Sequence, residues 1–137
     1  MKTEKISVNL SPVELGQIDC LVERGLYDNR SDFMRAAARK TLENYTDEIQ
    51  QFLKPENLEN EGTSLAFTFG VGRLSKDEVM NYIAKNKKMH IRVIGIYTIS
   101  KKITPDEIKQ VIASCNVHGI LIAEKDIIEA LRDISDD

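Results

Sequence analysis

Cysteine and histidine are scarce in this sequence, and the spacing of the cysteines argues against a fold held together by disulfides or by zinc. Of 137 residues only two are cysteine and two are histidine. Cys20 and Cys115 lie in different segments, and neither belongs to a C-x-x-C pair, so a disulfide framework or a paired-cysteine zinc site is not expected. We expect both thiols to be reduced and structural.

Long apolar runs are also missing. No stretch approaches the ~20 apolar residues that span a bilayer, and no signal-peptide core stands at the N-terminus. We therefore expect no membrane partner and a cytoplasmic, nucleoid-associated protein.

No group of residues has the pattern of a catalytic or cofactor site. Gly70-Val71-Gly72 lacks the third glycine of a dinucleotide-binding loop, and no nucleophile, base and orienting group occur together. The pairs Asp77-Glu78 and Asp106-Glu107 fall in predicted first turns of helices, where carboxylates suit the helix dipole. The sequence thus predicts neither an enzyme nor a cofactor-binding protein.

The clearest structural signals of the sequence lie in its N-terminal stretch. Between Lys5 and Ser11, apolar residues alternate with polar ones, which predicts a short strand with Ile6, Val8 and Leu10 on one side and Lys5, Ser7 and Asn9 on the other. A helix start follows, because Ser11, Pro12 and Glu14 make a capping box with proline at the first helical position. Gly25 is typical of a helix end.

A second helix is predicted directly after the first. Asp28 or Asn29 can cap it, and apolar residues at helical spacing continue beyond the first stripe up to Pro55, so we expect one long helix. The stripe and its continuation are Phe33, Met34, Ala37, Ala38, Leu42, Tyr45, Ile49, Phe52 and Leu53.

A single strand with two helices has no sheet partner of its own and too few residues for an independent core. The simplest solution is a twofold dimer in which two copies of the strand pair antiparallel above four helices. The polar side chains of both strands then line a two-stranded ribbon, which fits the major groove of B-form DNA.

The order of strand, S-P-x-E-L and N-R-S-D-F-x-R resembles the ribbon-helix-helix (MetJ/Arc/CopG-type) transcription regulators, over roughly the first third of the chain. The resemblance implies that Lys5, Ser7 and Asn9 read base edges. It also implies that Asn29, Arg30 and Ser31, at the start of the second helix, hold a DNA phosphate through backbone N–H groups and the helix dipole.

The net charge of the sequence supports DNA binding less strongly than its motifs do. The net charge is −3, and the first 45 residues carry seven basic and seven acidic side chains, so the acid excess lies beyond them. Because phosphate neutralisation supplies much of non-specific affinity, we expect weak non-specific binding and a modest salt dependence.

The second half of the chain repeats itself. Gly70, Gly95 and Gly119 are spaced by 25 and 24 residues, each within a strand-like segment that runs into a helical one. The expected strands are Leu65–Leu74, His90–Ile99 and Val117–Ala123. Three β–α units favour a parallel sheet or a short solenoid with open ends, which we expect to self-associate.

The predicted fold class is therefore α+β, with an intertwined ribbon-helix-helix dimer followed by a small α/β domain of about three β–α repeats. We expect residues 1–53 to form the DNA-binding domain with its extended second helix, 54–64 a polar linker, and 65–137 an oligomerisation or effector domain.

Metal binding is a weak alternative for the second domain. The layout of the chain resembles that of nickel-responsive repressors, and the candidate ligands are His90, Cys115 and His118. No H-x-H cluster is present and the repeat order differs from a split β-α-β arrangement, so we expect no metal and no other cofactor.

Together these features predict a sequence-specific repressor that binds double-stranded DNA as a homodimer, and possibly as a tetramer held by the second domain. Three alternatives stay open at this point. They are an antitoxin that regulates its own promoter, a DNA-coating or partition protein, and a repressor responsive to a metal or small molecule.

Overall fold

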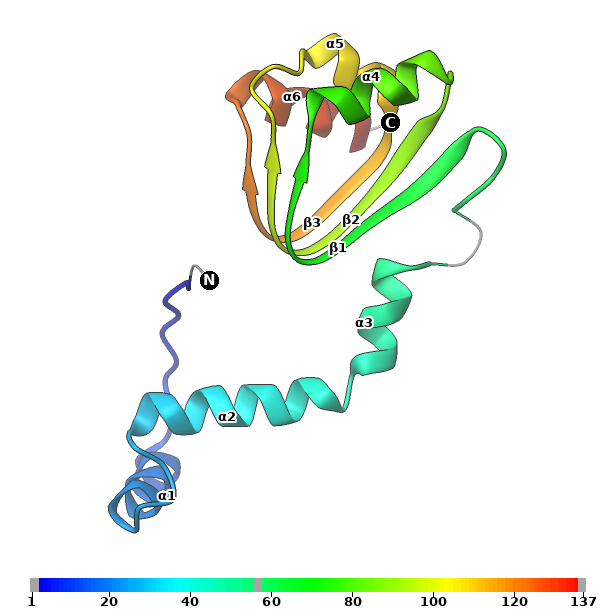
Figure 1. The fold of residues 1–137 in the computed structure, drawn as a ribbon. Helices are drawn as coiled ribbons and strands as arrows, with labels where there is room; N and C mark the ends of the chain where they lie inside the picture. The colour runs from blue at the N-terminus through cyan, green and yellow to red at the C-terminus, as the bar shows by residue number, and fades with distance from the viewer. Residues whose placement is uncertain (1–2, 56–57, 136–137) are drawn as a thin grey trace. The chain divides into compact units, whose positions relative to one another are not determined.

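A computed structural model describes residues 3–55 and 58–135 of the chain. These residues form six helices and one three-stranded parallel sheet (Figure 1). The chain divides into two compact units, Met1–Thr46 and Asp47–Asp137. No helix among the described residues is both long and apolar enough to cross a membrane.

The N-terminal unit contains two helices, α1 (Pro12–Glu23) and α2 (Arg30–Glu43). The capping box predicted at Ser11 is confirmed, because the Glu14 N–H donates to Ser11 Oγ at 3.2 Å and the Glu14 carboxylate accepts from the Ser11 N–H. α1 ends close to Gly25, as the sequence predicted. Gly25 has φ +80°, and the Leu26 N–H reaches back to the Leu21 carbonyl at 3.1 Å, as in a Schellman turn.

Two expectations for this unit differ from the structure. Residues 3–11 form neither helix nor strand in the single chain, because a strand needs a hydrogen-bonded neighbour. The second helix is not continuous up to Pro55. It ends at Glu43, and α3 (Thr46–Leu53) begins separately after Asn44 and Tyr45. Thr46 Oγ1 donates to the Glu43 carbonyl at 3.0 Å, which fixes the break.

The C-terminal unit confirms three successive β–α repeats. Its elements are β1 (Thr63–Leu74), α4 (Lys76–Ala84), β2 (Lys88–Ile99), α5 (Pro105–Val111), β3 (Ile112–Ile122) and α6 (Lys125–Ser135). The strands are longer than expected, β3 most of all, because α5 runs into it without a loop. The linker predicted at 54–64 includes residues 56 and 57, which lie outside the described residues, and its last two residues belong to β1.

The strands pair in parallel in the order β1-β2-β3, with their three glycines in register. Gly70, Gly95 and Gly119 all have positive φ, between +114° and +133°. A Cβ on Gly95 would lie 1.9 Å from the Gly70 carbonyl oxygen, and one on Gly119 would lie 2.0 Å from that of Gly95. Only glycine fits this ladder, which explains the repeat spacing, and Figure 1 shows the three strands curving together.

Helices α4, α5 and α6 all lie on the concave side of the curved sheet (Figure 1). Alternate residues of β2 point into the core between these layers, where Met89, Ile91, Val93, Tyr97 and Ile99 are buried. The helices contribute buried side chains such as Val79, Ile108 and Ile127. One face of the sheet is thus fully used for packing.

Candidate nucleic-acid interface

The predicted ribbon segment precedes α1 as an uncovered stretch of chain. Lys5, Ser7 and Asn9 are all exposed, as a base-reading role requires. Their apolar neighbours are exposed too, with 81% of Ile6 and 55% of Val8 accessible. A side of a strand that carries isoleucine and valine in water lacks a partner, so the single chain leaves this segment incomplete.

The same shortage of burial extends through the whole N-terminal unit. Ile18 is the one side chain of the described residues 3–46 that is buried. Several large apolar side chains are exposed instead, namely Ile6, Val8, Val13, Leu26 and Leu42. Two helices with one buried residue cannot offset the entropy of ordering the chain, so this unit requires additional apolar contacts.

The start of α2 is built as the sequence indicated. Asn29 is the N-cap, and its side-chain oxygen accepts the Asp32 N–H at 2.8 Å. Asp32 Oδ2 in turn accepts the Asp28 N–H at 3.1 Å. The N–H groups of Arg30 and Ser31 belong to the first turn, which has no intrahelical acceptors for them. This arrangement offers two backbone donors and the positive end of the helix dipole to an anion.

The Arg30 side chain has a partner that the sequence did not reveal. Its Nε and Nη2 each donate to one carboxylate oxygen of Asp19, both at 2.8 Å. This bidentate pair joins α1 to the start of α2, and the hydrogen bonds from Arg30 lower the pKa of Asp19. The two residues are eleven positions apart in the sequence, and this spacing does not predict their contact. The guanidinium is thus held by α1, and the backbone N–H groups are the donors of this turn that have no intrahelical acceptor.

An aromatic pair also fixes this turn. The rings of Tyr27 and Phe33 are 5.1 Å apart and meet edge to face at 83°. Together with the Arg30–Asp19 pair and the Gly25 turn, this contact sets the path from α1 to the N-terminus of α2. A rigid connection of this kind is what a phosphate contact requires in order to fix register on a duplex.

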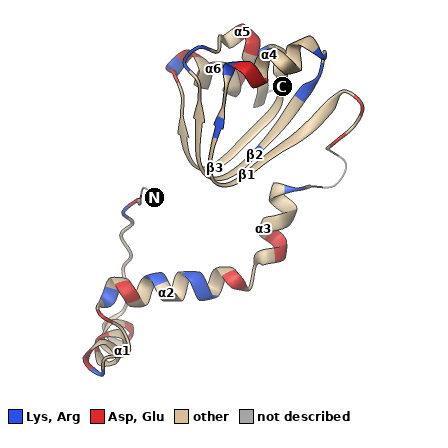
Figure 2. Cartoon of the chain, in the orientation of Figure 1, with Lys and Arg blue, Asp and Glu red and all other residues tan. Residues whose placement is uncertain are grey.

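Charge is mixed throughout the described part of this unit. Figure 2 shows both basic and acidic residues along α2. The basic side chains of α2 are Arg30, Arg35, Arg39 and Lys40, against Asp32 and Glu43. These residues therefore do not form a broad basic field, and binding of an anion here would depend on the local placement of donors.

The three candidate metal ligands are not brought together. His90 and His118 lie on the sheet face away from the helices, where His90 Nδ1 is 2.7 Å from Ser114 Oγ and the His118 ring is 4.5 Å from that of Phe52. Cys115 packs on the opposite, helix-covered face, where burial raises the pKa of its thiol to about 11. Burial also lowers the pKa of His90, with Arg92 adding to the shift. Among the described residues, no three His, Cys, Asp or Glu side chains cluster as metal ligands.

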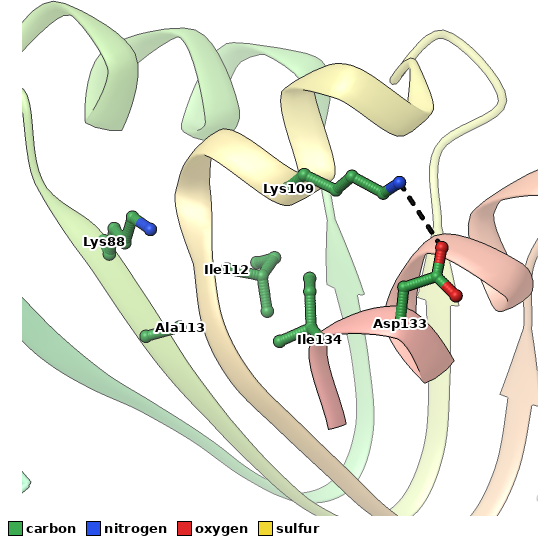
Figure 3. A pocket seen from close by; sticks show the side chains of 6 residues that line it. All are labelled: Lys88, Lys109, Ile112, Ala113, Asp133 and Ile134. Atoms are coloured by element: carbon green, nitrogen blue, oxygen red, sulfur yellow. Dashed lines mark ion pairs between the residues drawn. The ribbon is translucent and has the colours of Figure 1, made fainter. Parts of the chain in front are cut away.

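The C-terminal unit has a shallow pocket of about 430 Å³ beneath α5 and α6 (Figure 3). Its charged lining residues already satisfy one another in part, because Lys109 Nζ lies 3.3 Å from Asp133 Oδ2. The remaining lining side chains are Lys88, Ile112, Ala113 and Ile134. No convergent set of polar groups faces this space, so it does not define a ligand site.

Comparison with known proteins supports the sequence motifs. The profile of the Ribbon-Helix-Helix transcriptional regulator family matches residues 1–128. We expected this likeness over the first third only, and the match corrects that expectation, since it also includes the sheet and the start of α6. No curated protein and no solved structure matches the chain significantly.

Proposed function

Since the chain belongs to the ribbon-helix-helix transcriptional regulator family, we propose that it is a repressor which inserts a two-stranded antiparallel ribbon into the major groove of its operator. The family consists of regulators that bind DNA and typically dimerise. The observation that carries the finer proposal is the alternation of polar and apolar residues in 5–10, together with the exposure of the apolar residues Ile6 and Val8.

In this proposal, two copies pair their N-terminal strands and bury Ile6 and Val8 against the helices below. Lys5, Ser7 and Asn9 of both copies then face the base edges. Lysine donates to guanine and asparagine pairs with adenine through two hydrogen bonds, so these side chains are suited to base readout. The same pairing supplies the apolar contacts that the N-terminal unit lacks.

The start of α2 holds the DNA backbone. The free N–H groups of Arg30 and Ser31 donate to a phosphate, while Asn29 caps the helix and keeps these donors in place. Such a contact carries no sequence information but fixes the position of the ribbon in the groove.

We also infer that the C-terminal unit holds copies of the protein together. It has a core of its own, which is unlike a toxin-binding tail that is disordered until bound. Linking DNA-binding units in this way raises the effective concentration at a second half-site, which favours operator occupancy over coating of random sequence.

Base reading is tested by selecting binding sites from random DNA with the wild-type chain and with Lys5→Ala/Asn9→Ala. The matched control, Lys40→Ala/Asn44→Ala, removes the same two residue types from the far end of α2. We expect an enriched repeat for wild type and control, and no enrichment for the ribbon variant, which keeps its salt-dependent background. Equal enrichment for all three proteins would refute base reading by the ribbon.

The phosphate contact is tested at a single position. Arg30→Ala removes the guanidinium and keeps the N–H, whereas Arg30→Pro removes both. Proline is compatible here, because it would occupy the first helical position after extended Asn29. We expect Arg30→Pro to bind every sequence about tenfold more weakly than Arg30→Ala. Equal affinities of the two variants would remove the backbone donor from the proposal.

A further inference from the structure

The side of the sheet away from the helices is largely apolar. We call the side chains on it the outer face. They lie in rows across the in-register strands, which are Leu65–His90–Ser114, Phe67–Arg92–Asn116, Phe69–Ile94–His118, Val71–Ile96–Ile120 and Arg73–Thr98–Ile122. Isoleucine, valine and phenylalanine dominate the last three rows, and none of these strand residues is acidic.

The end of α3 packs against part of this face. Phe52 contacts His118, Lys54 Nζ lies 4.4 Å from the centre of the Phe67 ring, and Leu53 is buried. These contacts leave the far rows uncovered. Phe69 and Val71 are each 68% accessible and Ile122 is 47% accessible.

This exposure is unusual for such a sheet. Parallel sheets occur almost only where both faces are covered, because their strands are apolar on both sides. Among the described residues of the C-terminal unit, the large exposed apolar side chains are Phe67, Phe69, Val71 and Ile122 on the outer face and Met80 on α4. Exposure of large apolar groups is therefore concentrated on the one face that the three covering helices do not reach.

The size of the patch fits a protein interface. The four exposed side chains present roughly 400 Å² of apolar surface, and half-exposed neighbours such as Ile94, Ile96 and Ile120 extend it. A standard interface buries about 800 Å² on each partner, so this patch provides about half of one before its polar rim is counted.

We propose that the outer face is covered by the outer face of a second copy of this chain. A twofold contact needs one self-complementary patch, and an apolar patch meets this requirement without matched charges. Arg73 lies at an end of the patch, so its charge stays in water at the rim. The inference rests on the proposed oligomerising role of this unit and names the surface responsible.

The family's dimerisation explains why half an interface is sufficient. Pairing through the N-terminal strands presents two outer faces at the millimolar effective concentrations that short connections give. A contact that holds free units together only as their concentration approaches the millimolar range then becomes populated within the assembly. The outer face is therefore a second contact between copies, in addition to the pairing of their N-terminal strands.

The test uses the full chain with the ribbon disabled by Val8→Glu, so that remaining association reports on the outer face. We expect sedimentation up to about 1 mM to show dimers of Val8→Glu. Adding Val71→Lys should raise the dissociation constant about 100-fold, because twofold symmetry places the change in the contact twice. The control, Val8→Glu/Met80→Lys, introduces lysine at another exposed apolar position, on helix α4, and should leave association unchanged.

Two results would overturn the proposal. One is a monomeric Val8→Glu chain throughout the concentration range, and the other is equal effects of Val71→Lys and Met80→Lys. If lysine unfolds the sheet, as judged by circular dichroism, Val71→Thr keeps the β-branched shape and should still raise the dissociation constant about tenfold. Operator selection with Val71→Lys in the intact-ribbon chain separates the two proposals, because base reading should persist when the outer face is lost.

Discussion

The two compact units of this chain differ in how many of their apolar side chains are buried within one chain. Within residues 3–46 Ile18 alone is buried, whereas the C-terminal unit has a cluster of fourteen buried residues between its sheet and helices. In the dimer proposed above, the N-terminal unit reaches its stable form through a second chain, whereas the C-terminal unit has a core within one chain. Stability of the first should therefore depend on protein concentration and that of the second on local geometry.

The largest expected effect comes from the glycine ladder. Gly95→Ala places a Cβ 1.9 Å from the Gly70 carbonyl oxygen at a residue with φ +133°, so the strands must separate. We expect the free energy of unfolding of the C-terminal unit to fall by about 3 kcal/mol or more, at every protein concentration. Chemical denaturation measures it.

Gly16→Ala is the matched substitution in the N-terminal unit. Gly16 lies within α1 and has nothing within 4 Å of its Cβ position, so alanine should stabilise that helix by up to about 1 kcal/mol. Opposite signs for the same change would confirm that the ladder, and not glycine as such, sets the stability of the sheet. A loss at Gly95 below about 1 kcal/mol would contradict the close approach of the strands.

Val8→Glu should have the next largest effect, and only on the N-terminal unit. A carboxylate in the paired strand would be buried without a partner, so dimerisation through the ribbon should fail and operator affinity should fall by about 100-fold or more. Hydrogen exchange should show lost protection in α1 and α2, while β1 to β3 stay protected. Lost protection in the sheet as well would show that the two units are not independent.

Matched capping boxes offer a third comparison. Glu14 donates its N–H to Ser11 Oγ and Glu107 donates its N–H to Thr104 Oγ1, both at 3.2 Å. Alanine at either cap should cost about 1 kcal/mol per helix. In the C-terminal unit this lowers the melting temperature alone, whereas in the dimer two copies are affected and the dissociation constant should rise about 30-fold. Analytical ultracentrifugation and thermal melts distinguish the two results.

The sequence revealed local features of this fold better than distant contacts. Capping at Ser11, the turn at Gly25 and the three β–α repeats were predictable, because each depends on residues close in sequence or on a fixed period. The break between α2 and α3 was not, since apolar spacing continues through Tyr45 and a short turn leaves no glycine or proline signal. The length of β3 was underestimated because no loop residues separate it from α5.

For the candidate site, sequence patterns identified the N-cap Asn29, but not the pairing of Arg30 with Asp19. That contact depends on the angle between α1 and α2, which tertiary packing sets. The outer face was missed for a similar reason. Alternation within β1 to β3 shows that both sides are apolar, but which side the helices cover follows only from the assembled unit.

The smallest effect concerns the ion pair that joins α4 to α5. Lys76 Nζ donates to both carboxylate oxygens of Glu107, and these bonds, with the Thr104 N–H, lower the pKa of Glu107 below its ordinary value of 4.5. The contribution of this ion pair to stability is therefore complete above pH 4.5 and is lost as the pH falls through the lowered pKa of Glu107.

Glu107→Gln keeps the capping acceptor and removes the charge, so we expect a loss of about 1 kcal/mol at pH 7 that vanishes in acid. Denaturation at several pH values measures this difference, and Lys76→Met serves as the control because it should flatten the same profile. A loss that persists unchanged in acid would mean that packing of the side chain, and not its charge, holds the two helices. Because the pair lies entirely within the self-sufficient unit, its effect should not change with protein concentration, in contrast to every substitution that weakens the ribbon.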